Sequence, residues 1–218
     1  MEIIWFGQAC FRLKGKNGTV IIDPYDPQMV GLKLPRELLA DVVLSTHSHA
    51  DHNNTSIVEG TSSRPIMTFT EPGEYEISGV VITGISSFHD DSSGSERGAN
   101  TIFHLMIDGL NILHLGDFGQ SKLTEEQLSQ IGQTDILLIP VGGKFTVNGK
   151  TASEIVAQLE PKIIIPMHYA VEGLKFELDP VENFLKEMGV EGITPVPKLS
   201  ITRDKLPEEP QVIVLSKT

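Results

Sequence analysis

The chain is poor in cysteine, in basic residues and in long apolar runs. Cys10 is its single cysteine among 218 residues, so no internal disulfide can form, which fits a reducing compartment. Lys and Arg number 17 against 29 Asp and Glu, a formal net charge of −12. Such an acidic surface repels phosphate backbones, so we expect neither nucleic acid nor an anionic membrane as a general partner.

No apolar run approaches the ~20 residues that cross a bilayer. The segment Met1–Phe6 lacks the basic region of a secretion signal, so we expect a cytoplasmic protein. The length suits one domain with a sizeable core, and no linker-like break divides the sequence. We therefore expect a single domain over 1–218. The sequence leaves open whether it forms a homo-oligomer.

Hydrophobic periodicity predicts β structure in the first half of the chain and alternating helices and strands in the second. Strands are expected at 2–6, 10–14, 19–22, 41–45, 65–69, 75–77, 80–85, 101–107, 110–115, 135–141, 162–166 and 211–215. Short helical segments are expected at 34–39 and 53–58, and a long loop at 86–100. Strands followed by helices that arrive later to cover them indicate sheets sandwiched between helical layers, a mixed α/β architecture.

Three longer helices carry recognisable start signals. Thr124 with Gln127 forms a capping box for a helix to about residue 131, and Thr151 with Glu154 repeats that pattern for a helix ending before Pro161. A third helix is expected to start at Pro180 and end at Gly189.

The most informative stretch is 46–52, which follows the apolar run 41–45. It contains three imidazoles and one carboxylate: His47, His49, Asp51 and His52. Residues two apart in an extended segment point the same way, so His47 and His49 can bind one ion together. Imidazole and carboxylate ligands suit zinc, manganese or iron. The pattern predicts a metal site.

Three more donor residues follow predicted strands: His89, Asp117 and His168. Each alone is explained equally well without a function: His89 and Asp117 as polar loop residues, and His168 as a core histidine. Together with the 46–52 segment they place five imidazoles and two carboxylates at strand-to-loop junctions, which favours a functional site.

These motifs resemble the ligand series of the metallo-β-lactamase fold. The passages 22–24, 72–75, 97–100, 114–117, 140–143 and 166–169 are similar to those of its lactonase-like branch, which is related to L-ascorbate-6-phosphate lactonase. The resemblance implies a four-layer αββα sandwich and two divalent metal ions, with zinc favoured and manganese or iron compatible. His47, His49 and His89 would bind the first ion, Asp51, His52 and His168 the second, and Asp117 would bridge the two. Relatives often have a histidine where this chain has Gln8.

The implied reaction is hydrolysis of a small, anionic lactone, ester or amide. Two metal ions lower the pKa of a shared water to near 7, and the hydroxide attacks the substrate. Asp51 is the expected catalytic residue, orienting that hydroxide and passing its proton to the leaving group. Two alternatives remain open: a phosphodiesterase or nuclease with the same site, and a metal-binding or diiron redox scaffold with little hydrolytic activity.

Several nearby residues have two interpretations. Asp23 either supports the ligands or ends a strand, and His114 either contacts the ligands or packs in the core. Arg97, Lys144 and Tyr169 adjoin the proposed ligands and are candidates for holding an anionic substrate group, although solvated surface charge explains Arg97 and Lys144 equally well.

Overall fold

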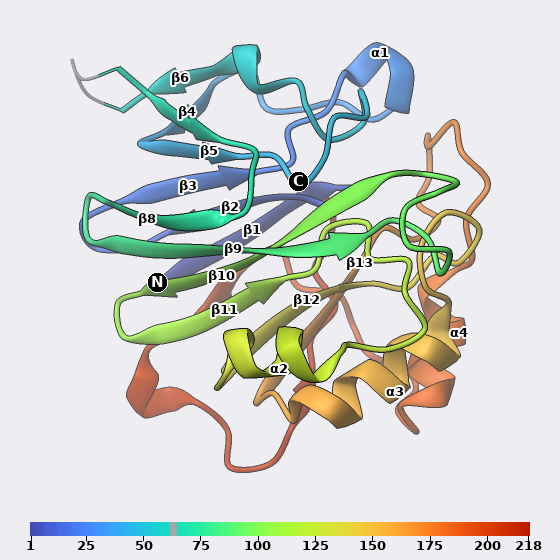
Figure 1. Ribbon diagram of the computed structural model, residues 1–218. Coiled ribbons are helices and arrows are strands. Elements are labelled where there is room, and N and C mark those ends of the chain that lie inside the picture. Colours follow the sequence, from blue (N-terminus) through green and yellow to red (C-terminus); the bar gives the residue numbers. More distant parts are fainter. Residues whose placement is uncertain (62–64) are drawn as a thin grey trace.

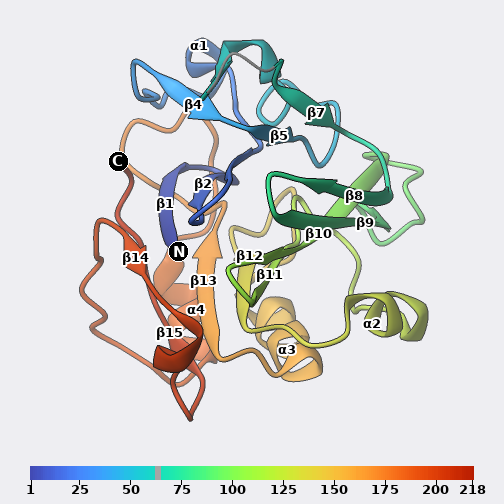
Figure 2. The same cartoon turned by 90° about the vertical axis from the view of Figure 1, so that its left-hand side faces the viewer.

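A computed structural model describes residues 1–61 and 65–218 of the chain. Two β-sheets lie face to face, with helices outside the second sheet and a thinner layer outside the first (Figure 1). Figure 2, turned by 90° about the vertical axis, also separates the two sheets.

The first sheet has the strand order β14-β1-β2-β3-β5-β7. Its strands are β14 (Leu199–Ser200), β1 (Glu2–Gly7), β2 (Cys10–Lys14), β3 (Thr19–Ile22), β5 (Val42–Leu44) and β7 (Met67–Phe69). The strands β1, β2 and β3, all expected from the sequence, form an antiparallel meander, and β5 then adds parallel to β3. A parallel addition directs the chain after β5 toward the same sheet edge as the chain after β3.

The second sheet has the order β15-β13-β12-β11-β10-β9-β8. Its strands are β15 (Gln211–Val212), β13 (Ile163–Met167), β12 (Ile136–Pro140), β11 (Leu110–His114), β10 (Ala99–Ile107), β9 (Val80–Phe88) and β8 (Gly73–Ile77). All residues of β12 and β13 are buried, as their continuous apolar runs predict for parallel strands covered on both faces.

The main core lies between the sheets and continues beneath the helices. The facing side chains include Trp5 and Phe11 of the first sheet and Phe103 and Ile112 of the second. Helices α2 (Glu125–Ile131), α3 (Gly149–Leu159) and α4 (Val181–Glu187) lie outside the second sheet.

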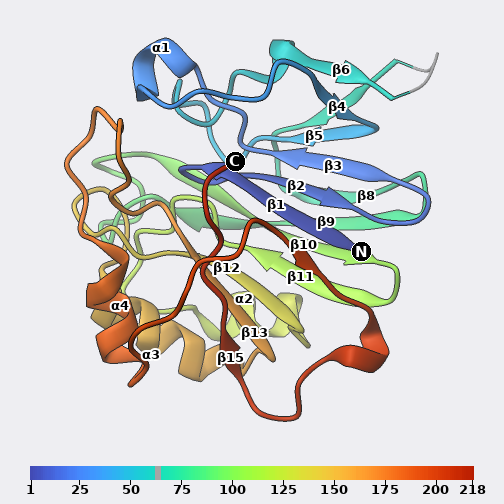
Figure 3. The same cartoon turned by 180° about the vertical axis from the view of Figure 1, so that it is seen from behind.

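A smaller apolar cluster covers the outer face of the first sheet. It is completed by helix α1 (Pro27–Val30) and the short parallel pair β4 (Leu38–Ala40) and β6 (Val58–Gly60). Figures 1 and 3 place these elements on the opposite side of the molecule from α2, α3 and α4. The αββα layering is therefore present, but one outer helical layer is reduced to a single helical turn.

Two helical predictions near this layer are wrong. The segment predicted as a helical turn at 34–39 ends in strand β4, where Leu38 and Ala40 are buried and Leu39 is exposed, a period of two. The helix predicted at 53–58 is reduced to a 3₁₀ turn, Thr55–Ile57, before β6. Asn54 precedes it but makes no capping bond, because its amide donates to the Tyr25 carbonyl instead.

Helix starts and loop lengths agree with the sequence only in part. The capping box of Thr124 and Gln127 is confirmed. The second predicted box is wrong, because α3 starts earlier and its cap is Asn148, whose side chain accepts from the Thr151 N–H. The long loop shrinks to 89–98, since β9 and β10 extend into the predicted loop. Within the described residues, no helix is long and apolar enough to cross a membrane.

Candidate metal centre

A buried carboxylate shapes the histidine-rich loop that follows β5. Asp23 accepts hydrogen bonds from the Thr46 N–H at 2.7 Å, the Thr46 hydroxyl at 2.8 Å and His52 Nδ1 at 3.0 Å. The hydroxyl of Ser45 donates to the carbonyls of His47 and His52, which closes the loop on itself. The loop is thus fixed at its start and at its end.

The other three donors arrive from the ends of three strands of the second sheet. His89 follows β9, Asp117 follows β11, and His168 follows β13. A backbone bond from the Thr101 N–H to the Thr46 carbonyl, 2.8 Å long, joins the second sheet to the loop of the first. Both sheets therefore contribute side chains to one edge of the sandwich.

Close approach of the two sheets at this edge depends on Gly116. Its φ is +58°, and a Cβ there would collide with the side chains of Asn100 and Thr46. Asn100 Oδ1 also accepts from the Asp117 N–H at 3.0 Å, so the same contact orients Asp117.

All seven predicted side chains converge in two groups. The first contains His47, His49 and His89, and the second contains Asp51, His52, Asp117 and His168. Within each group the donor atoms lie within 4.8 Å of one another. Asp117 Oδ2 lies 3.2 Å from His52 Nε2, 3.3 Å from His89 Nε2 and 3.4 Å from His168 Nε2, so this carboxylate contacts both groups.

Burial and mutual charge set the protonation of these groups. Burial lowers the pKa of His47 to about 3 and also lowers the pKa of His89, which keeps both imidazoles neutral at pH 7. Burial would raise the pKa of Asp117, but His168 and His52 outweigh it and hold the pKa well below its usual value. Asp51 behaves alike: burial opposes ionisation, yet the adjacent His52 brings its pKa to about 2.

His52 behaves differently from the other imidazoles. Burial acts to lower its pKa, but the carboxylates of Asp117 and Asp23 hold that pKa well above its ordinary value. Two anions therefore compete for one buried imidazole, which indicates a site with surplus negative charge at its centre.

Several buried donor atoms here have no hydrogen-bond partner among the described residues. They are His47 Nε2, His52 Nε2, His89 Nδ1, Asp117 Oδ1 and His168 Nδ1. Buried polar atoms without a partner are costly, typically ~1–3 kcal/mol each. Imidazole nitrogens and carboxylate oxygens are also what divalent transition-metal ions bind. The residues fit such ions, and the site is able to hold metal.

Comparison with known proteins agrees with this geometry. Residues 2–168 match the family described as the beta-lactamase superfamily domain. The chain belongs to this superfamily. A UPF0173 metal-dependent hydrolase of Thermoplasma acidophilum is 31% identical over 189 residues, covering 78% of this chain and 83% of the relative. The resemblance to the metallo-β-lactamase fold is confirmed.

Solved structures support the fold. A Thermotoga maritima protein assigned to the Zn-dependent hydrolases of the metallo-β-lactamase superfamily has a TM-score of 0.78 at 37% identity, covering 98% of this chain and 97% of its own. The diiron β-hydroxylase CmlA of Streptomyces venezuelae has a TM-score of 0.63 at 13% identity, covering 92% of this chain and 54% of its own, and shares only the fold. The predicted αββα sandwich is confirmed.

The structure separates the remaining candidates. His114 is buried; its Nε2 donates to the Ala9 carbonyl at 2.9 Å, and its Nδ1 accepts from the Gly116 N–H at 3.1 Å. It therefore positions the turn before Asp117. Gln8 is also buried, with its amide nitrogen 3.4 Å from His168 Nε2.

Two suggested anion-binding residues do not face the site freely. Tyr169 is buried, packs its ring 4.9 Å from that of Trp5, and points its hydroxyl at the Leu215 carbonyl. The suggestion for Tyr169 is wrong, because the left-handed backbone of His168 (φ +52°) turns the chain back into the core at this point. The ammonium of Lys144 forms an exposed ion pair with Glu177 at 2.6 Å.

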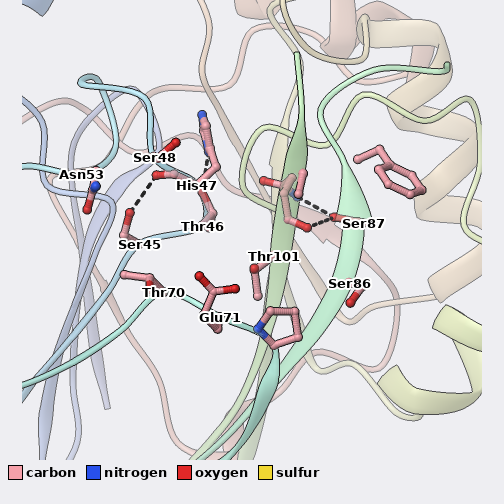
Figure 4. Close-up of a pocket in the computed structure, with 14 residues that line it drawn as sticks. Ser45, Thr46, His47, Ser48, Asn53, Thr70, Glu71, Ser86, Ser87 and Thr101 are labelled. Carbon is pink, nitrogen blue, oxygen red and sulfur yellow. Dashed lines mark hydrogen bonds between the residues drawn. The ribbon is translucent and has the colours of Figure 1, made fainter. Parts of the chain in front are cut away.

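A cavity of about 320 Å³ opens at the metal centre. Its lining includes four of the seven donors, His49, Asp51, His89 and Asp117, together with Met29, Arg97, Phe145 and Phe176. The three apolar members were not anticipated, because they lie in segments whose proximity only the fold creates. A second cavity of about 520 Å³ lies on the other side of the 45–48 loop, where Ser45, Glu71 and Thr101 line it (Figure 4). Of the seven donors it reaches only His47.

Proposed function

We propose that the protein is a metal-dependent hydrolase that holds two divalent ions, preferably zinc, and cleaves a small carbonyl substrate such as a lactone, ester or amide. The observation that carries this proposal is the position of Asp117, whose carboxylate lies within 3.4 Å of imidazole nitrogens from three separate loops. The two relatives described above are named as a metal-dependent and a Zn-dependent hydrolase, which supports the same conclusion.

The two groups of donors support the following ligand assignment. His47, His49 and His89 would hold one ion, Asp51, His52 and His168 the other, and Asp117 would contact both. When bound, such ions supply Lewis acidity and a water whose pKa falls to near 7.

Asp51 is the chain's own candidate for handling the proton. Its side chain is 15% exposed and lines the open cavity, whereas that of Asp117 is 2% exposed. An ionised carboxylate in this position accepts a hydrogen bond from the attacking water and orients it. As the water oxygen bonds to the carbonyl carbon, its proton passes through Asp51 to the leaving oxygen or nitrogen when the acyl bond breaks.

Asp23 determines which nitrogen of His52 faces the centre. Because His52 Nδ1 donates to Asp23, the Nε2 atom is directed at Asp117 and at the metal position. A carboxylate behind a metal-binding imidazole fixes its tautomer and raises its basicity. We assign Asp23 to this supporting role.

The alternatives differ in metal and in substrate. A nuclease needs a basic surface to hold its polyanionic substrate, and the net charge of −12 disfavours it. A diiron redox scaffold would use the same ligands, and the metal content distinguishes it from a zinc hydrolase.

The test is elemental analysis of the purified protein, followed by assays on a panel of lactones, esters, amides and phosphodiesters with and without chelator. We expect about two equivalents of zinc and chelator-sensitive cleavage of a carbonyl substrate. Asp117→Asn should lose metal and activity together. His104→Gln is the matched control, because His104 lies in β10 outside both groups of donors.

Two results would reject the proposal. Activity that persists after chelation and in Asp117→Asn would remove metal-assisted hydrolysis. An iron pair in protein without hydrolytic activity on any member of the panel would favour the redox scaffold.

A further inference from the structure

The cavity at the metal centre has two chemically different sides. Its floor consists of the donors His49, Asp51, His89 and Asp117, and its rim carries three large apolar side chains and one cation. A substrate bound there meets both sides at once, so the rim determines which molecules the centre can act on.

The apolar part of the rim comes from three distant segments. Met29 belongs to α1, Phe145 follows β12 and Phe176 follows β13. Met29 is 42% exposed and Phe145 39% exposed, and the rings of Phe145 and Phe176 meet edge to face with centroids 6.4 Å apart. Exposed apolar side chains that gather beside a polar centre mark a surface for the apolar part of a ligand.

These segments are tied together, so the rim is preformed. The Lys175 N–H donates to the Val30 carbonyl at 3.0 Å, which joins the Phe176 segment to the end of α1. Gly31 permits this approach: its φ is +89°, and a Cβ there would strike the backbone of Gly173. A preformed apolar surface binds its ligand without the cost of ordering itself.

Arg97 is the cation of the rim. Its guanidinium carbon lies 5.9 Å from the centre of the Phe145 ring, and one terminal nitrogen donates to the Lys144 carbonyl at 3.4 Å. No carboxylate pairs with Arg97 in the part of the chain that the structure describes, although the protein carries 29 acidic residues. The neighbouring Lys144 is paired with Glu177 and does not line the cavity, so Arg97 is the cation among the lining residues.

The backbone of Arg97 is held by hydrogen bonds to a single carboxylate, that of Asp90. Asp90 accepts hydrogen bonds from the N–H groups of Ser92, Gly94, Glu96 and Arg97, each between 2.8 and 3.0 Å long. The same loop begins at His89, whose N–H donates to the Gly98 carbonyl. The backbone positions of His89 and Arg97 are therefore set by one ordered loop.

We propose that the substrate is a small amphiphilic carboxylate: its scissile carbonyl lies over the donors, its apolar body rests on Met29, Phe145 and Phe176, and its carboxylate binds Arg97. The planar guanidinium fork matches the two oxygens of a carboxylate. The single charge of a carboxylate matches one guanidinium, whereas a phosphate dianion carries two charges. This assignment rests on the proposed hydrolase function and adds the substrate class to it.

The kinetic test compares two substrates that differ in one charge. They are the mono-4-nitrophenyl ester of adipic acid and its methyl ester, in which the carboxylate is masked. We expect the zinc-loaded enzyme to prefer the free acid by about ten- to hundredfold in kcat/KM, mainly through KM, the size expected for a charge-assisted hydrogen-bond pair. Arg97→Gln should abolish this preference by raising KM for the free acid to about that for the methyl ester.

Two further variants sharpen the comparison. Lys144→Gln removes a neighbouring charge that is already paired, so the preference should survive. Met29→Ala should raise KM for both substrates equally, because both share the apolar body and Met29 lines the same cavity. An unchanged preference in Arg97→Gln, or an equal loss of preference in Lys144→Gln, would overturn the assignment to Arg97.

A binding measurement separates this proposal from the hydrolase proposal. Calorimetry of the metal-loaded protein with 4-phenylbutyrate and with 4-phenylbutanol needs no turnover. Tighter binding of the acid that disappears in Arg97→Gln supports the substrate class, even if neither ester is cleaved and the hydrolase proposal fails. If Arg97→Gln binds the acid as well as the wild type does, the carboxylate is held elsewhere and the proposal is wrong.

Discussion

At the scale of single residues, Asp23 links the fold to the metal centre. It is fully buried, with a φ of +50°, and its carboxylate organises Thr46 and His52 through three hydrogen bonds. Asn tolerates the same left-handed backbone, so Asp23→Asn changes mainly the charge and one acceptor. We expect it to weaken metal binding about 10- to 100-fold and to lower stability by ~1–3 kcal/mol.

The measurement is a competitive zinc titration together with urea unfolding. Asp26→Asn is the matched control, because Asp26 accepts a single hydrogen bond from the Gln28 N–H at the start of α1. It should leave metal affinity unchanged. Equal zinc affinity in Asp23→Asn and wild type would show that Asp23 serves only as a strand terminator.

Local sequence patterns, together with the resemblance to a known fold, were enough to find the donor residues but left the roles of Asp23 and His114 open. His47, His49, Asp51 and His52 are close in sequence, and the remaining donors follow apolar strands that had to end at a sheet edge. Tyr169 was misjudged because its neighbour His168 reverses the backbone, which no propensity indicates. Arg97, Phe145 and Phe176 lie in three segments that are distant in the sequence, so only the folded chain shows that they meet.

At the scale of elements, the start of helix α3 can be tested by replacing its capping residue. Asn148 caps it, whereas the sequence pattern favoured Thr151. Replacing an Asn cap by Ala typically costs ~1 kcal/mol, since a backbone N–H loses its acceptor. Asn148→Ala should therefore lower the unfolding free energy by about that amount, while Thr151→Ala should change it by less than ~0.5 kcal/mol. Urea denaturation of both variants measures this, and a larger loss in Thr151→Ala would restore the original prediction.

The loop 89–98 is a second element whose order can be tested, because the Asp90 carboxylate holds its backbone. Backbone hydrogen bonds, the one from Arg97 foremost, lower the pKa of Asp90 to about 2. A carboxylate whose folded pKa lies below its unfolded value of ~3.9 stabilises the folded loop above that value, and the contribution is lost as pH falls toward 2. Asp90→Ala should reproduce at pH 7 the loop opening that acid causes.

Hydrogen exchange of the Gly94 and Arg97 amides measures this opening. Both should exchange faster in Asp90→Ala than in wild type at pH 7. Asp91→Ala is the control, because Asp91 accepts a single bond from the Ser121 N–H and none from the loop itself. Unchanged exchange in Asp90→Ala would mean that other contacts order the loop.

Sequence reasoning succeeded for elements whose apolar runs are long and failed for short ones. Strands β12 and β13 are apolar throughout and were placed to within a residue or two. The short strands β4 and β6 were missed because pairing with each other, and not a local apolar run, is what stabilises them. The outer layer of the first sheet was therefore the part least determined by local pattern.

At the scale of the whole molecule, the metal centre joins the two sheets. The loop after β5 supplies His47, His49, Asp51 and His52 from the first sheet, and the second sheet supplies the remaining three donors. Ions bound to both groups would act as a cross-link between the two halves of the sandwich. Metal binding and global stability should then be coupled, since ligand that binds only the folded state stabilises it.

Metal removal should therefore lower the melting temperature of the whole protein. At a free zinc concentration 100 times the dissociation constant, binding contributes ~2.7 kcal/mol, which corresponds to a fall of roughly 5–10 °C on chelation for a chain of this size. Calorimetry with chelator and after zinc is restored measures the change. Asp117→Asn, which lacks the carboxylate common to both groups, should melt at nearly the same temperature with and without zinc. The cross-link would be contradicted if chelation removed the metal from wild-type protein without changing its melting temperature. The two sheets would then be held together by their apolar core alone.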